Sequence, residues 1–353
     1  MYSRIRALRA QFKSLPFEAF WVGKPVNVVY LTERASLEGW LFVTSRQTYF
    51  LTDPRYESQA RHHLRGIHLR IYSEKKPFND VLKEIIRSSR VKRIGFDPRH
   101  VSVTFYKKLR RASPSGVRWL PQEGCVESLR MVKSPEEISR IRKALAFHLR
   151  CLKYLKTIVK AGATEGLLRE RLEHYVRRQH LSFSFEPIIA SGPNSSYPHA
   201  PVTNRRLKAK DHVMVDFGID WGGYKSDLTR IFFLGKIPAL IRETAENVRV
   251  AQKEAIKRIR PGMRACAVDQ LTRKYLSSKG LGKYFCHSLG HGVGLEIHEA
   301  PWISPSSKTT LKPGMVFTVE PGVYFPGRFG IRLEDMVLVT GNGCELLSGS
   351  QDR

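Results

Sequence analysis

Five side chains of the types that bind divalent metal ions recur through the second half of the chain: Asp216, Asp227, His291, Glu320 and Glu334. Both aspartates lie in the stretch VDFGIDWGGYKSDLTR (215–230), each beside an apolar run that is typical of a buried strand. A lone carboxylate there would pay a large desolvation penalty or stay protonated. Because four carboxylates cannot share an apolar core without cations, the pattern predicts divalent ions held between strands.

The ligand chemistry narrows the choice of metal. His291 lies in GHGVGLEIHE (290–299), whose glycines let the backbone approach a site closely. Four oxygens and one nitrogen favour manganese, cobalt or iron over a structural zinc site, which would use cysteine and histidine. We expect two divalent ions, manganese first, with cobalt, iron and zinc as alternatives. Asp220, beside WGG, is instead expected to cap a hairpin turn.

A faint internal repeat distributes these residues over two halves. The segment 161–181 aligns without a gap on 261–281, with three identities. The next blocks, 207–218 and 311–322, place Asp216 on Glu320. Further on, Asp227 corresponds to Glu334, and PHAP answers IHEAP, which sets His199 beside His298. Each half therefore contributes carboxylates at matching places.

Together these motifs closely resemble the pita-bread fold metallopeptidases, in the branch of the proline-specific peptidases aminopeptidase P and prolidase. The resemblance rests on VDFGIDWGGYKSDLTR, GHGVGLEIHE, TVEPGVY and GIRLEDMVLVT, with ligands spaced by 11, 64, 29 and 14 residues. DPRYESQA (53–60) resembles the opening domain of that branch, so nearly the whole chain is covered. Methionine aminopeptidases share the metal site but generally lack such a domain.

The resemblance implies a role for each ligand. Asp216 would chelate one metal, and Asp227 and Glu334 would bridge both. His291 and Glu320 would complete the second metal. A hydroxide between the ions would be the nucleophile, because two metals lower the pKa of bound water and stabilise charge on the carbonyl oxygen. Glu320 would also take and pass the proton.

Three further residues match positions that do not bind metal in the family. His199 and His298 would hydrogen-bond the substrate carbonyl and the tetrahedral intermediate. Arg332 matches an arginine that steadies the ligand network; without the resemblance, a plain surface strand explains it equally well.

The resemblance implies an exopeptidase that removes the N-terminal residue from peptides with proline at the second position. A bond to proline nitrogen carries no N–H, so a dedicated pocket is needed. Prolidase, which cleaves Xaa-Pro dipeptides, is the alternative. Some prolidases hold the dipeptide carboxylate with a basic residue where this chain has Trp302, which favours longer peptides. NVVYLTERAS also lacks the glycine and aromatic residue common after YLT in the family.

Two other readings use the same fold. Some relatives lost the metal ligands and became nucleic-acid or histone-binding modules, and creatinase-like hydrolases work without metals. The complete ligand set argues against both. The net charge of +28 raises the question of nucleic-acid binding. However, residues 1–130 contain 25 basic and 11 acidic residues, and residues 131–353 contain 35 basic and 21 acidic residues. Because the charge is spread evenly and no nucleic-acid motif accompanies it, nucleic acid is not an expected partner.

The expected fold class is α+β. A smaller creatinase-like α/β domain (1–122) and a linker (123–134) precede a pita-bread catalytic domain (135–353) with a pseudo-twofold repeat. No run of 18 apolar residues and no secretory signal is present, so we expect a cytoplasmic protein without a membrane span. The five scattered cysteines are expected to be small buried hydrophobes. The family implies a homo-oligomer, either a dimer or a tetramer.

Local patterns predict the elements. Pro135 follows Ser134, with glutamates after it, which predicts a capped helix start. The apolar residues at positions 5, 8, 12 and 15 predict an amphipathic helix rather than a transit peptide. Strands are expected at 26–32, 39–45, 48–53, within 183–234 and after 284. Helices are expected at 57–64, 78–89, 135–160, 164–180, 238–260 and 265–279, and 112–124 reads as a linker.

Overall fold

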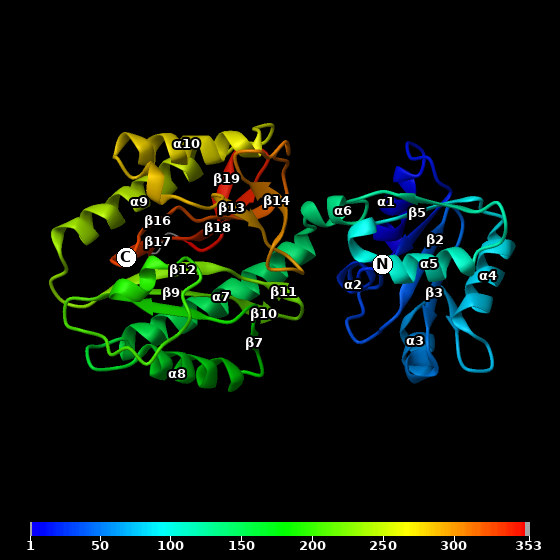
Figure 1. Ribbon diagram of the computed structural model, residues 1–353, viewed down its shortest axis with the longest axis horizontal. Helices are drawn as coiled ribbons and strands as arrows, with labels where there is room; N and C mark the ends of the chain where they lie inside the picture. Colours follow the sequence, from blue (N-terminus) through cyan, green and yellow to red (C-terminus); the bar gives the residue numbers. More distant parts are fainter. Residues whose placement is uncertain (1, 350–353) are drawn as a thin grey trace. The chain divides into compact units, whose positions relative to one another are not determined.

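The computed structural model describes residues 2–349 (Figure 1), and the chain divides into two compact units, Met1–Arg130 and Met131–Arg353. The predicted linker 123–134 contains the short helix α6 (Glu127–Met131). The end of the predicted catalytic domain, 350–353, lies outside the described residues. Each unit has its own buried apolar core.

The N-terminal unit is a six-stranded mixed sheet with the strand order β4-β3-β2-β1-β5-β6. Its strands are β1 (Ala19–Val22), β2 (Trp40–Thr44), β3 (Thr48–Thr52), β4 (His68–Ile71), β5 (Arg93–Phe96) and β6 (Arg118–Pro121). Its helices are α1 (Tyr2–Gln11), α2 (Pro25–Thr32), α3 (Glu57–His63), α4 (Phe78–Ser89) and α5 (Val103–Arg111). The predicted linker 112–124 thus holds the edge strand β6. Helix α1 buries Ile5 and Leu8 as predicted, but it ends at Gln11, so the other two predicted positions, Phe12 and Leu15, lie beyond the helix.

The strand predicted at 26–32 is wrong, because this segment forms helix α2. Its Val and Tyr residues favour strands, but Pro25 occupies the first helical position, where its fixed φ suits a helix. Val28 and Leu31, three residues apart, are almost fully buried on one face. Tertiary packing of that face therefore overrides the intrinsic strand preference.

In the C-terminal unit, helices lie on both sides of the strands, α7 and α8 on one side and α9 and α10 on the other (Figure 1). These helices are α7 (Pro135–Ile158), α8 (Glu165–Arg177), α9 (Ala239–Arg258) and α10 (Ala265–Ser278). The start of α7 is confirmed: the Ser134 hydroxyl accepts from Glu137 N, and the Glu137 carboxylate accepts from Ser134 N at 2.9 Å.

The strands between these helices form several small sheets. One has the order β12-β9-β8 and another the order β14-β13-β15-β18-β19. The bounds are β7 (Ser182–Phe183), β8 (Ile188–Ser191), β9 (His212–Phe217), β10 (Ile219–Trp221), β11 (Tyr224–Lys225), β12 (Leu228–Phe233), β13 (Gly290–Gly292), β14 (Glu299–Ile303), β15 (Val316–Val319), β16 (Gly322–Phe325), β17 (Phe329–Arg332), β18 (Asp335–Val339) and β19 (Cys344–Leu346). Strands β16 and β17 form a hairpin.

The internal repeat is present in the structure, where matching residues of the two halves form matching hydrogen bonds. Gly162 and Gly262 both have positive φ angles, 90° and 86°, before the second helix of each half. Their N–H groups donate to Leu207 O and Leu311 O, each at 2.8 Å. The two halves therefore fold as copies of one helix–helix–strand unit, which confirms the pseudo-twofold fold class.

The cysteines differ from expectation at one position. Cys125 and Cys151 are buried, and Cys266 and Cys344 are half-buried, but Cys286 is exposed. Cys286 lies in the loop between a short 3₁₀ turn (Gly282–Tyr284) and β13. None of the five forms a disulfide. Within residues 2–349, no helix is long and apolar enough to cross a membrane.

Candidate metal centre

Two strand pairs bring the predicted ligands together. Asp216 lies near the end of β9, opposite Thr229 on β12. Glu320 directly follows β15, while Asp227 and Glu334 directly precede β12 and β18. The Glu334 N–H donates to Thr229 O at 3.2 Å, which joins the two sheets next to the carboxylates.

Three predicted ligands form a compact buried cluster. One ligand atom from each of Asp227, His291 and Glu334 lies within 4.8 Å of the others. These residues are only 3%, 8% and 2% exposed. Glu320 joins them through His291, whose Nε2 lies 3.3 Å from Glu320 Oε1 and 3.6 Å from Asp227 Oδ2. The cluster combines residues from both halves of the repeat.

Asp216 is placed by Arg332, which is buried and not on a plain surface strand. The Arg332 guanidinium pairs with Asp216 Oδ2 through Nη2. Its Nη1 donates to Tyr324 Oη at 2.6 Å and to Pro198 O at 3.1 Å, and its Nε donates to Thr229 Oγ1 at 3.1 Å. This network fixes the Asp216 carboxylate relative to both sheets.

Three of the four ligand carboxylates are in an environment that opposes their negative charge, whereas at Glu320 the effect of burial is outweighed by the hydrogen bond and charge of His291 and by other nearby positive groups, which lower the pKa of Glu320 to about 2. Burial and the charge of Glu334 raise the pKa of Asp227 well above its ordinary value. Burial and the charge of Glu320 do the same to the pKa of Glu334. Burial also raises the pKa of Asp216, although Arg332 acts against this shift. A bound cation would oppose these shifts, because positive charge nearby favours the ionised form of each acid.

The residues present fit a divalent metal centre. Asp216 Oδ1 is buried and has no hydrogen-bond partner among the described residues, so a lone pair is free for a ligand. After burial, the charges of neighbouring acids raise the pKa values of Asp227 and Glu334, and added positive charge would relieve that repulsion. Carboxylate oxygens with one imidazole nitrogen form a donor set suited to borderline and hard divalent metals.

The two predicted non-ligand histidines are more open to solvent than the ligands. His199 and His298 are exposed. The His298 ring stands nearly perpendicular to that of His291, with ring centroids 4.3 Å apart. His199 is close enough for its charge to affect the pKa values of Asp216 and His298. Both histidines therefore accompany the cluster on its solvent side.

Several supporting residues were missed by sequence reasoning. Thr229 Oγ1 donates to Glu334 Oε2 at 2.7 Å, and Thr318 Oγ1 donates to Glu320 Oε1 at 3.1 Å. Each threonine lies two positions from a predicted ligand in a strand, so the two-residue strand period could have found it. No comparable signal marked Tyr324, whose hydroxyl accepts from Arg332 and lies 3.2 Å from His287 Nε2.

A second missed feature is a buried ion pair behind the histidine loop. Lys133 Nζ lies 2.8 Å from Glu299 Oε1, and the two side chains are 0% and 5% exposed. Glu299 directly follows His298, so this pair holds the chain at the start of β14. No sequence pattern predicted that Lys133 and Glu299, which are far apart in the chain, would form an ion pair.

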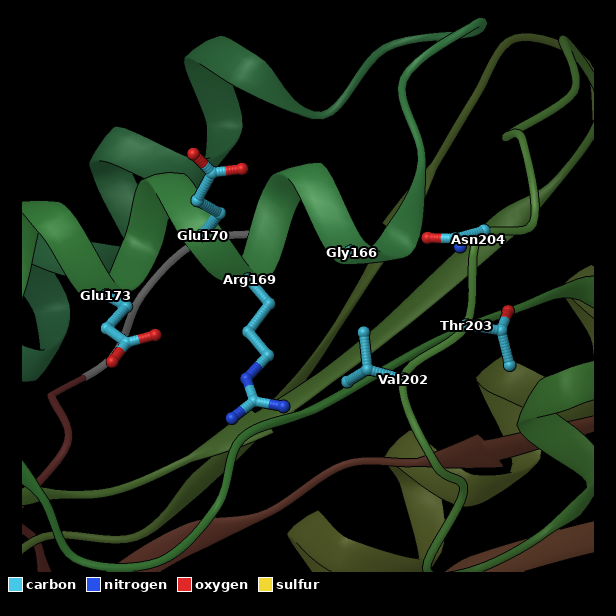
Figure 2. A pocket seen from close by; sticks show the side chains of 7 residues that line it. All are labelled: Gly166, Arg169, Glu170, Glu173, Val202, Thr203 and Asn204. Atoms are coloured by element: carbon cyan, nitrogen blue, oxygen red, sulfur yellow. The ribbon is translucent and has the colours of Figure 1, made fainter.

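Two other features lie outside this centre. Asp97, His100 and Glu127 also cluster, but the Asp97 carboxylate already binds Arg99 and Gly124 N. A shallow surface pocket of about 360 Å³ lies along α8 (Figure 2), and none of the predicted ligands line it. Asp220 caps its hairpin turn as predicted, because its Oδ1 accepts from Gly223 N at 2.8 Å.

Comparison with known proteins places this geometry in a family. The chain is 32% identical to the "Xaa-Pro dipeptidase" of Pyrococcus furiosus, over 99% of both chains. The solved "Xaa-Pro dipeptidase from Bacillus anthracis" superposes with a TM-score of 0.95 at 31% identity, covering 100% of this chain and 98% of that one. An "X-Pro aminopeptidase from Thermotoga maritima" superposes with a TM-score of 0.86 at 29% identity, covering 96% and 97%.

Family models match both units. Residues 4–132 match the creatinase/prolidase N-terminal domain. Residues 139–341, which contain every predicted ligand, match metallopeptidase family M24. The predicted two-domain pita-bread architecture is thereby confirmed. The chain belongs to metallopeptidase family M24.

Proposed function

We propose that this protein is a metal-dependent exopeptidase that hydrolyses the N-terminal Xaa-Pro bond of peptides. The observation that carries the proposal is the buried cluster of Asp227, His291 and Glu334, with Glu320 beside His291. We propose that Asp216, held by Arg332, completes the ligand set. Specificity for proline is supported by the relatives above, whose names specify Xaa-Pro or X-Pro substrates. We propose two divalent ions, manganese first, with cobalt, iron or zinc as alternatives.

Each residue of the site has a chemical task in this proposal. Two divalent ions bound by the five ligands would lower the pKa of water and polarise the scissile carbonyl. The Glu320 carboxylate, oriented by Thr318, accepts a proton from the attacking water and passes it to the leaving prolyl nitrogen. His199 and His298 donate hydrogen bonds to the substrate carbonyl as negative charge develops on it.

Within this class, we propose an aminopeptidase that accepts peptides longer than two residues. Trp302 on β14 is 48% exposed, and its ring lies 6.3 Å from that of His291. An indole cannot neutralise the C-terminal carboxylate of a dipeptide, whereas it can pack against a continuing chain. The second candidate is a prolidase, favoured by the dipeptidase names of two of the relatives above.

Product release from two peptides tests the proposal. The protein is stripped of metal, reloaded with manganese, and given Arg-Pro-Pro or Ala-Pro. We expect free arginine from the tripeptide and little alanine from the dipeptide. Strong cleavage of Ala-Pro alone would assign a prolidase. Cleavage of neither peptide by the manganese-loaded protein would refute Xaa-Pro hydrolysis.

The proposal extends to the setting of the enzyme. We propose a homo-oligomer, dimer or tetramer, and a reducing cytoplasm, which suits five cysteines without a disulfide. Light scattering in solution would give the mass of the assembly. Nucleic acid is not a proposed partner, and strong salt-dependent retention of DNA or RNA would contradict this.

A further inference from the structure

Both ends of the loop that carries His199 form hydrogen bonds with one side chain, that of Glu165. This loop runs from Ser191, at the end of β8, through a 3₁₀ turn (Gly192–Ser196) to Thr203. Glu165, at the first position of α8, is completely buried. Its Oε1 accepts from Ser191 N and Ser191 Oγ, each at 2.7 Å.

The second carboxylate oxygen of Glu165 binds the rest of the loop. Oε2 accepts from Asn194 Nδ2 at 2.9 Å, from Thr203 N at 3.0 Å and from Thr203 Oγ1 at 2.5 Å. Five donors from the two ends of one loop therefore converge on a single buried carboxylate. An ionised group that accepts this many hydrogen bonds forms stronger and better directed contacts than a neutral one.

The backbone of α8 adds to this anchor. The Gly166 N–H donates to Thr203 O at 3.0 Å, and Figure 2 shows Asn204 and Thr203 at the start of α8, near Gly166. Near its middle, the loop meets the metal site, because Pro198 O accepts from Arg332 Nη1 at 3.1 Å. His199 follows directly, so it lies between the Glu165 anchor and the Arg332 network.

We propose that Glu165 is a positioning residue for catalysis, which acts through His199. By fixing both ends of the loop 191–203, its carboxylate sets where the exposed His199 imidazole stands relative to Asp216. The inference rests on the proposed function, because it assumes that His199 contacts the substrate. A misplacement of about 1 Å at such a group can cost on the order of 100-fold in rate.

The first variant is Glu165→Gln, which keeps the size of the side chain and one acceptor oxygen. Its amide NH2 would face other donors, so either the contacts at Ser191 or those at Asn194 and Thr203 are lost. We expect kcat on Arg-Pro-Pro to fall by roughly 10- to 100-fold, with an unchanged manganese stoichiometry. Glu170→Gln is the matched control, because Glu170 is exposed on the same helix and points away from the loop (Figure 2).

A double-mutant cycle separates positioning from a general structural role. If Glu165 acts through His199, Glu165→Gln should change kcat little in a His199→Ala background. If kcat of the double variant instead falls by the full product of the decreases in the two single variants, the proposal is overturned. Thr203→Val serves if Glu165→Gln does not fold, because it removes one of the five hydrogen bonds to Glu165, together with the bond that Thr203 Oγ1 accepts from Arg205 N. It should lower kcat in the wild type and not in His199→Ala.

The outcomes separate this inference from the proposed function. A wild-type protein that cleaves Arg-Pro-Pro, together with Glu165→Gln and Thr203→Val variants of equal kcat, would overturn the inference alone. A manganese-loaded wild type that cleaves no Xaa-Pro peptide would overturn the proposed function, and the inference with it.

Discussion

At the scale of residues, Asp227 and Glu334 occupy equivalent places in the two halves and meet in one cluster. Each stands just before a strand and is almost fully buried. Burial and the charge of Glu334 raise the pKa of Asp227, and a cation bound between the two carboxylates would oppose this shift. The sequence repeat could therefore predict which carboxylates meet.

Asp227→Asn tests the bridging role that the family resemblance implies for this carboxylate. The amide cannot bridge two cations as a carboxylate does, so we expect weaker manganese binding and a loss of turnover on the order of 100-fold or more, since even outer partners are worth 10- to 100-fold. Metal content by elemental analysis and turnover of Arg-Pro-Pro measure this. Asp220→Asn, at the turn cap, is the control and should behave as wild type. Wild-type turnover in Asp227→Asn would refute the role.

Arg332→Met tests the residue that holds Asp216. It leaves the partners of a buried guanidinium unpaired, so we expect the free energy of unfolding to fall by about 3–5 kcal/mol. Manganese affinity should fall by about 10- to 100-fold. Arg328→Met, exposed on the same hairpin, should change neither quantity. Urea unfolding and metal titration would check both, and equal values for the two variants would contradict the assignment.

At the scale of elements, sequence patterns with a local cause predicted the structure well. Ser134 and Glu137 cap α7 because both hydrogen bonds form within four residues of chain. Helix α2 was missed because its Val residues were judged by intrinsic preference, while packing of Val28 and Leu31 decided the outcome. The Glu165 anchor was also missed, since its partners lie 26 to 38 residues away and no local pattern links them.

Strand β9 begins with a histidine that makes stability depend on pH. Burial lowers the pKa of His212 to about 4, from an ordinary 6.5, and its Nδ1 has no hydrogen-bond partner among residues 2–349. The unfolded chain therefore binds a proton between pH 6.5 and 4 that the folded protein does not. The contribution of the neutral His212 ring to the free energy of unfolding is fully present above pH 6.5, and it is lost as the pH falls toward 4.

We expect this residue to contribute a slope of up to about 1.4 kcal/mol per pH unit in that range. Urea unfolding from pH 7.5 to 4.5 would measure it, with wild type and His212→Gln both stripped of metal. The variant cannot titrate, so its stability should fall less steeply with acid. Parallel curves for the two proteins would show that His212 does not titrate on unfolding.

At the scale of the whole molecule, metal binding should couple to the folding of the C-terminal unit, because its ligands come from both halves of the repeat. A ligand present at 100 times its dissociation constant stabilises the folded state by about 2.7 kcal/mol. For a unit of this size, that corresponds to an increase in Tm of roughly 5–10 °C.

Calorimetry with and without a chelator measures this effect. We expect chelation to lower the Tm of wild type and to leave that of Asp227→Asn nearly unchanged, because the variant holds little metal to lose. An equal decrease in both proteins would assign the stabilisation to metal bound elsewhere.

The measurement that tests the central claim most directly is hydrolysis of two matched tripeptides, Arg-Pro-Pro and Arg-Ala-Pro, as manganese is added back to metal-free protein. We predict no cleavage without metal, and release of arginine from Arg-Pro-Pro that increases until about two ions are bound per chain. Arg-Ala-Pro should stay intact. Cleavage by the metal-free protein, or equal cleavage of both peptides, would contradict a metal-dependent Xaa-Pro peptidase.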